Sequence, residues 1–177
     1  LSKFALESVE MIITRLLLED LSFEQTNICL DFLVNSVLKQ NFSKADFLNG
    51  CLTLILNQLF DNIAMGADER KVTKAFEKIA RIQESNKQQV AQTSNNNIDP
   101  LESINAHMLS IIENLAAKIN DSSQTAEFRI NYVKSFQFLL KIAGAQSVNV
   151  IQKVLPLLNL LLSNDVLRPY AADAYLT

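Results

Sequence analysis

The chain has 177 residues, 49% of them hydrophobic and 20% charged, which is typical of a folded globular protein and excludes a disordered one. Three glycines and three prolines supply too few turn residues for a β-sandwich or barrel, whereas residues that favour helices are abundant. A formal net charge of −3 gives no strong attraction to a phosphate backbone, so broad nucleic-acid binding is disfavoured.

The longest apolar runs do not suffice to cross a bilayer. Residues 154–162 are interrupted by Pro156 and Asn159, and residues 51–56 form an even shorter run, so we expect no membrane insertion. Cysteine occurs only twice, far below the density of a disulfide-stapled secreted domain, and we expect reduced thiols in an intracellular protein of the cytoplasm or nucleus. Because the chain begins without methionine, we expect a piece of a larger protein.

Apolar spacing predicts the first helices. A helix over residues 2–18 has apolar side chains at three-and-four spacing, which indicates one buried face: Ala5, Val9, Ile12 and Leu16. Ser22 then opens a second helix as its N-cap, with Gln25 completing a capping box. The buried face of this helix is expected to include Ile28, Phe32, Leu33 and Val37.

A third helix is expected to begin near Asp46 and to end at Gly66, and the short turns predict antiparallel packing. Asp68 caps a fourth helix with an apolar arc of Val72, Phe76 and Ile79. Four cations share an adjoining arc, here called the cationic ridge: Lys71, Lys74, Lys78 and Arg81. The cationic ridge is a candidate site for an acidic partner, although charge runs of this kind more often form a solvated face.

The second half restarts after a polar stretch. Residues 85–98, rich in Asn, Gln and Ser, predict a flexible loop, and Asp99 with Pro100 predicts a new helix start. The helix to about residue 120 has a polar stripe that we expect to be exposed: Ser103, His107, Ser110, Asn114 and Lys118. The next helix, about 124–143, is apolar on two sides and is predicted to need cover on both.

The last two helices are predicted from about residue 147, with Pro156 in the interior of the first, and over residues 166–177. The last is short, and we expect the carboxyl end to be truncated. The sequence therefore predicts an all-α fold of about seven or eight helices, stacked as antiparallel pairs in an α-solenoid. Residues 1–84 would hold about four helices and residues 99–177 three to four, with 85–98 between them.

Residues 154–176 resemble a HEAT repeat. Pro156 lies inside a helix, a Leu-rich run follows, Asp165 lies in a short turn, and a second helix carries Val166, Arg168 and small residues such as Ala171. The resemblance to the HEAT and armadillo family implies a solenoid whose curved surface grips other proteins. Nuclear transport receptors and the helical arms of very large kinases are among the proteins it implies.

No set of residues completes a catalytic or metal site. His107, the one histidine, has Ser103 and Ser110 a turn away but no acidic residue in register, so catalysis is not expected from it. One histidine and two cysteines, Cys29 and Cys51, cannot hold zinc without carboxylates, and the isolated glycines form no phosphate loop. We expect no enzyme activity, no cofactor, no metal and no small-molecule substrate.

The leading hypothesis is a protein-protein interaction scaffold segment of a larger helical-repeat protein, with protein partners in a larger assembly. One alternative is a fragment of a nuclear transport receptor, whose affinity for a small GTPase would change with the bound nucleotide. Another is a non-catalytic regulatory arm of a large enzyme, which would carry its catalytic domain elsewhere in the full-length chain.

Overall fold

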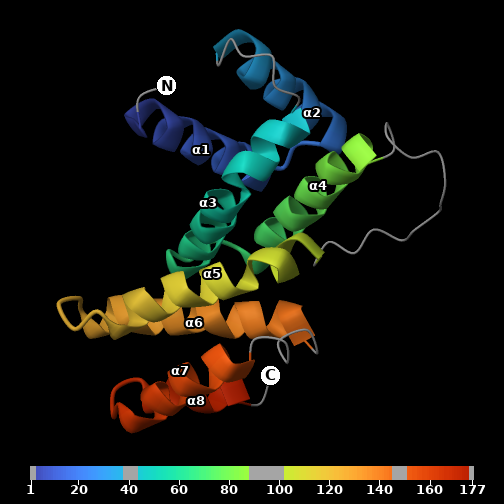
Figure 1. Ribbon diagram of the computed structural model, residues 1–177. Helices are drawn as coiled ribbons and strands as arrows, with labels where there is room; N and C mark the ends of the chain where they lie inside the picture. The colour runs from blue at the N-terminus through green and yellow to red at the C-terminus, as the bar shows by residue number, and fades with distance from the viewer. Residues whose placement is uncertain (1–2, 38–43, 88–101, 145–150, 176–177) are drawn as a thin grey trace. The chain divides into compact units, whose positions relative to one another are not determined.

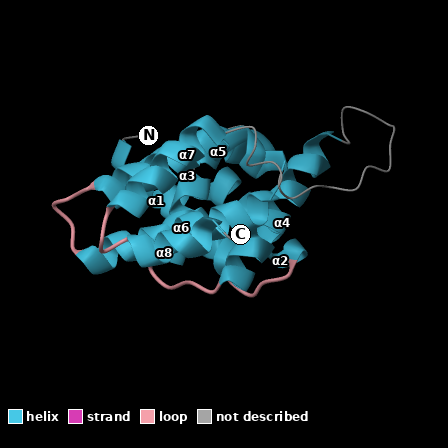
Figure 2. Ribbon diagram, turned by 90° about the horizontal axis from the view of Figure 1, so that it is seen from below, coloured by secondary structure: helices cyan, strands magenta, loops and turns pink. Residues whose placement is uncertain are grey.

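The computed structural model describes residues 3–37, 44–87, 102–144 and 151–175, and in these ranges every regular element is a helix (Figures 1 and 2). The elements are α1 (Lys3–Leu18), α2 (Phe23–Phe32), a π-helical turn η1 (Leu33–Val37), α3 (Lys44–Ala64), α4 (Glu69–Lys87), α5 (Glu102–Asn120), α6 (Ala126–Ala143), α7 (Ile151–Ser163) and α8 (Arg168–Tyr175). The predicted all-helical fold is confirmed. Within the described ranges, no helix combines the length and apolar character that crossing a membrane requires.

The chain divides into two compact units. Unit 1 comprises Leu1–Gln58 and Arg70–Ser103, and unit 2 comprises Leu59–Glu69 and Ile104–Thr177. Helix α3 therefore contributes its first part to unit 1 and its last part to unit 2. Of the loop predicted at 85–98, residues 85–87 still belong to α4, and residues 88–98 lie outside the described ranges.

Local capping explains where several helices begin and end. At the start of α2, the Ser22 hydroxyl accepts from the backbone N–H of Gln25 at 3.2 Å, and the Gln25 side chain accepts from Ser22 N–H at 2.9 Å, which confirms the predicted capping box. Gly66 and Gly144 have φ values of 91° and 48° after α3 and α6. Glycine takes these left-handed conformations without the steric cost of a Cβ, so both predicted helix stops are confirmed.

The buried residues of unit 1 agree with the apolar arc predicted for α4 and differ from the buried faces predicted for α1 and α2. The buried apolar residues of unit 1 include Val9, Ile13, Leu17, Leu30, Val34, Leu48, Leu52, Ile55, Leu56, Val72, Phe76 and Ile79. Ile12, predicted to be buried, is exposed. The prediction is also wrong for Ile28 and Phe32, which are 62% and 64% exposed, while Leu30 and Val34 face the core. Leu33 is half-buried, and Val37 lies outside the residues whose side chains are described. Helical periodicity defines the arcs of a helix but does not choose between two that are both apolar.

Unit 2 contains two antiparallel helix hairpins, α5–α6 and α7–α8, lying in layers (Figure 1). Helix α6 lies between neighbours: Arg129 Nε donates to Ile119 O of α5 at 2.6 Å, and Gln137 Nε2 donates to Tyr170 O of α8 at 2.6 Å. It also contacts the end of α3, where the Ser135 hydroxyl donates to Phe60 O at 2.6 Å. The prediction that this helix is covered on two sides is confirmed.

Candidate interaction surfaces

The cationic ridge of α4 faces the end of α1. Lys78 is only 8% exposed, and its Nζ donates to Leu17 O at 3.2 Å and to Glu19 O at 2.8 Å. The last carbonyls of a helix have no partner within the helix and carry the negative end of its dipole, so an ammonium group there is stabilising. Burial lowers the pKa of Lys78, an effect that the Asp20 carboxylate opposes. The central lysine of the ridge thus fastens α4 to the end of α1.

The other members of the cationic ridge differ in their surroundings. Lys71 Nζ lies 3.4 Å from an Asp20 carboxylate oxygen, and the Arg81 guanidinium lies 5.8 Å from the centre of the Phe23 ring. Lys74 is exposed. Three of the four cations therefore contact the turn between α1 and α2 or the first residue of α2. Binding of an acidic partner by the ridge stays a prediction, and Lys74 is the member that the structure leaves most open to it.

In unit 2, a polar cluster joins α3, α5 and α6. Lys118 Nζ contacts both carboxylate oxygens of Asp61, at 2.5 and 2.6 Å, and lies 4.9 Å from the centre of the Tyr132 ring. Burial raises the pKa of Tyr132, and the Asp61 carboxylate adds to this, while Lys118 opposes it. Phe128 packs against the same ring, with centroids 4.7 Å apart. The side chains of Asp61 and Lys118 are about three-quarters buried, and Lys118 lies over the Tyr132 ring. This ion pair therefore links α3, α5 and α6, and its charges are poorly accessible to a partner.

The polar stripe of α5 is less exposed than predicted. His107, Ser110, Asn114 and Lys118 are all half-buried, while Ser103 lies outside the residues whose side chains are described. Burial lowers the pKa of His107, so the neutral imidazole is favoured. The expectation of a solvated stripe is therefore wrong, and at the end of the stripe Lys118 packs on Asp61 of α3.

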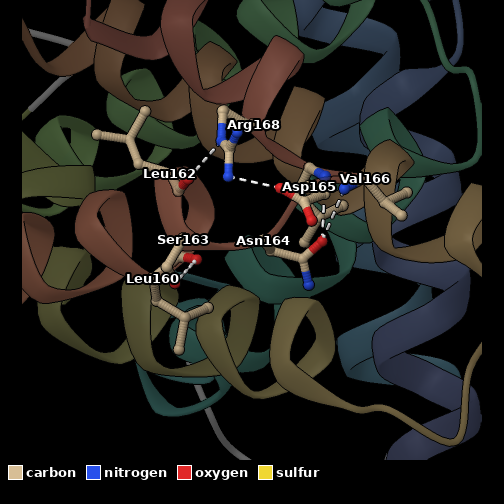
Figure 3. A network of polar contacts seen from close by, with 8 residues as sticks. Leu160, Leu162, Ser163, Asn164, Asp165, Val166 and Arg168 are labelled. Carbon is tan, nitrogen blue, oxygen red and sulfur yellow. Dashed lines mark hydrogen bonds and ion pairs between the residues drawn. The ribbon is translucent and has the colours of Figure 1, made fainter.

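The turn between α7 and α8 is held by its own polar side chains (Figure 3). The Asn164 Oδ1 atom accepts from the backbone N–H groups of Val166 and Leu167 at 3.1 and 3.2 Å. Arg168 donates from Nε to Leu162 O at 2.8 Å and from a terminal nitrogen to Asp165 Oδ1 at 2.5 Å. These contacts satisfy the Leu162 carbonyl at the end of α7 and two backbone N–H groups before α8. Asn164, Asp165 and Arg168 therefore stabilise the turn itself.

The two cysteines of unit 1 differ in burial. Both cysteines are free thiols; Cys29 is half-buried and Cys51 is buried, with its Sγ donating to Phe47 O at 3.1 Å. Burial, assisted by the Glu10 carboxylate, raises the pKa of Cys51 to about 12. Within the described ranges, no group of three or more histidine, cysteine or acidic side chains is placed to hold a metal ion.

The Cys51 thiol should resist labelling in the folded chain. With a pKa of about 12, only about one thiol in ten thousand is ionised at pH 8, and the thiolate is the reactive form. We expect an aromatic disulfide reagent to modify Cys51 in urea but not in buffer, with a Cys29→Ser variant used so that one thiol is followed. Rapid stoichiometric labelling of that variant in buffer would contradict the buried position of Cys51.

Large apolar side chains reach solvent on several helices. Those at least 40% exposed are Met11, Ile12, Ile28, Phe32, Leu54, Met65, Leu109, Leu155, Leu160 and Val166. On α2, Ile28 and Phe32 are one turn apart on a single face. On α7 the described exposed side chains carry no formal charge: Gln152, Leu155, Pro156, Asn159, Leu160 and Ser163. The exposed α2 face was not predicted, although Ile28 and Phe32 opposite Leu30 and Val34 already indicate a segment that is apolar on two sides.

In the described ranges these features define a helical protein that exposes several large apolar side chains among charged and polar ones. In comparisons with known families, residues 103–177 match the UME (NUC010) domain family. This match covers less than half of the chain and coincides with the α5–α8 part of unit 2. It overturns the assignment to the HEAT and armadillo family, which rested on residues 154–176 within the matched region. Comparison with characterised proteins and with solved structures gives no further match.

Proposed function

We propose that this chain is a non-catalytic scaffold segment that binds other proteins through exposed helix faces. The observation that supports the proposal is the pair of exposed apolar side chains one turn apart on α2, Ile28 and Phe32. On α7, Leu155, Pro156 and Leu160 add to an exposed arc whose described side chains carry no charge. Single exposed apolar residues are common on protein surfaces, but apolar groups on one face indicate an interaction site. The layered hairpins of unit 2 suit this role, because stacked helices present their outer faces side by side.

We also propose that successive helix pairs stack as in an α-solenoid, so that one face of each pair is accessible to partners. Lys78, Lys118 and Arg168 form hydrogen bonds within the chain, so these three charged side chains stabilise the fold and are not assigned to partner binding. In this proposal specificity comes from shape and apolar contact, with charged side chains at the margins.

The experiment compares the proteins that co-purify with the full-length protein and with two double variants, Ile28→Ser/Phe32→Ser and Leu155→Ser/Leu160→Ser. All four residues are exposed, so we expect unchanged circular dichroism and the loss of at least one partner from at least one variant. Lys134→Ser serves as a control at an exposed polar position of α6. An unchanged set of partners for both variants, together with enzymatic turnover by the chain, would refute the proposal.

A further inference from the structure

The exposed face of α2 combines apolar and acidic side chains. We call Glu24, Ile28, Asp31 and Phe32 the α2 stripe. Glu24, Ile28 and Phe32 follow one another at intervals of four residues and are all exposed, and Asp31 lies beside them, half-buried. Helix α2, over Phe23–Phe32, carries these two acidic residues and no basic one.

Helix α2 cannot bury this stripe by turning on unit 1. Its opposite arc is already in the core: Thr26, Leu30 and Val34 are at most 3% exposed, and the Thr26 hydroxyl donates to Ser22 O at 2.9 Å. Rolling the helix to cover Ile28 and Phe32 would expose Leu30 and Val34 in exchange, with no gain in buried apolar area. The capping box at Ser22 and Gln25 also fixes where the helix starts. The stripe is therefore a fixed feature of the folded unit.

The far end of the stripe meets the π-helical turn η1 (Leu33–Val37), which follows α2 directly. The N–H of Leu33 is shared between Cys29 O and Leu30 O, so the hydrogen-bonding pattern changes where the exposed Phe32 gives way to the buried Val34. Turns of this kind are rare and occur frequently at functional sites. The stripe therefore ends where the backbone leaves the regular α-helical pattern.

The charges around α2 determine which partner fits. At its beginning, Lys71 pairs with Asp20, Lys78 with the last carbonyls of α1, and Arg81 lies over Phe23, so these cations are engaged at the α1–α2 turn. Along the helix itself, Glu24 is exposed one turn before Ile28, whereas Asp31 is half-buried and already takes part in an interaction within the chain. A complementary surface has apolar residues at its centre and positive charges at its margins.

We propose that the α2 stripe binds an amphipathic helix of another protein, with two apolar residues one turn apart facing Ile28 and Phe32 and with lysine or arginine near Glu24. A helix packs on a helix face through side chains at three-and-four spacing, which is the spacing that the stripe offers. This inference rests on the proposed scaffold function and names the class of partner for one of its faces. The small contact area gives weak binding when this face acts alone.

The test uses a short synthetic helical peptide with leucines at i, i+4 and i+7 and lysines flanking them, and a matched peptide with glutamates in place of the lysines. Each is titrated into the whole chain by fluorescence anisotropy. We expect the lysine peptide to bind at least about tenfold more tightly than the glutamate peptide, with Phe32→Ser and Ile28→Ser each weakening it about tenfold or more. Glu24→Lys should reduce the preference for the lysine peptide. Met65→Ser, at a 77% exposed apolar position of unit 2, should change nothing.

Equal affinity for the two peptides, or binding that Phe32→Ser leaves unchanged, would overturn the inference. Sedimentation analysis of the chain alone tests another occupant: self-association that Phe32→Ser abolishes would show that a second copy covers the stripe, and would also overturn it. If these peptide results are negative while Leu155→Ser/Leu160→Ser still removes cellular partners, the inference about α2 fails and the scaffold function stands.

Discussion

Replacing Phe60 by alanine is expected to lower the free energy of unfolding of unit 2 by about 3–5 kcal/mol. The Phe60 ring is fully buried, with its centroid 6.1 Å from that of Phe138 on α6. Removing it would leave a cavity between α3 and α6 that rigid helices cannot fill completely. The result can be followed selectively, because the chain has no tryptophan and all three tyrosines, at 132, 170 and 175, belong to unit 2. Urea unfolding monitored by tyrosine fluorescence therefore reports on this unit.

The matched control for Phe60 is Phe32→Ala, which removes a phenylalanine of the same size from a 64% exposed position. We expect the control to change the stability of the chain by less than about 0.5–1 kcal/mol, followed by circular dichroism. If Phe60→Ala cost no more than Phe32→Ala, the packing of α3 against α6 within unit 2 would be incorrect.

The second large effect is expected for Lys78→Met, which keeps the length of the side chain and removes its charge. The carbonyls of Leu17 and Glu19 would lose their ammonium donor, and leaving such groups unsatisfied costs about 1–3 kcal/mol. The free energy of unfolding, measured by far-UV circular dichroism in urea, should fall by this amount. Lys74→Met, one turn away on the same helix and exposed, should leave it within about 0.5 kcal/mol. Equal behaviour of the two variants would show that Lys78 is a surface cation, as a partner-binding ridge requires.

Helix positions and caps could be predicted from the sequence because they depend on neighbouring residues. The Ser22–Gln25 capping box and the glycine stops at Gly66 and Gly144 are local chemistry, and all are confirmed. Burial depends on residues far apart in the chain, and the predictions of buried faces were correct for α4 and wrong for α2. The arc of Val72, Phe76 and Ile79 is confirmed because α4 has one apolar face and one charged face. On α2, with two apolar faces, the choice depends on contacts that periodicity does not encode.

The cationic ridge and the family assignment show why short patterns can mislead. Four cations on one arc indicate a surface, but whether a carbonyl lies 2.8 Å from one of them depends on where α1 ends in space. Likewise, the contacts of Asn164, Asp165 and Arg168 show that the Asp-containing turn before Arg168 meets the requirements of a tight helix hairpin (Figure 3). Such requirements are shared by many helical families, so the resemblance to HEAT repeats was not specific.

Hydroxyl-radical footprinting with mass spectrometry tests the exposed apolar faces most directly. Phe32 and Phe136 provide an internal comparison, because the first is 64% exposed and the second is fully buried. We expect rapid modification of Phe32 in the isolated chain, slow modification of Phe136, and protection of Phe32 when the lysine peptide or a cellular partner is bound. If Phe32 were modified as slowly as Phe136 in the isolated chain, the α2 face would be part of the core and the proposed surface would not exist.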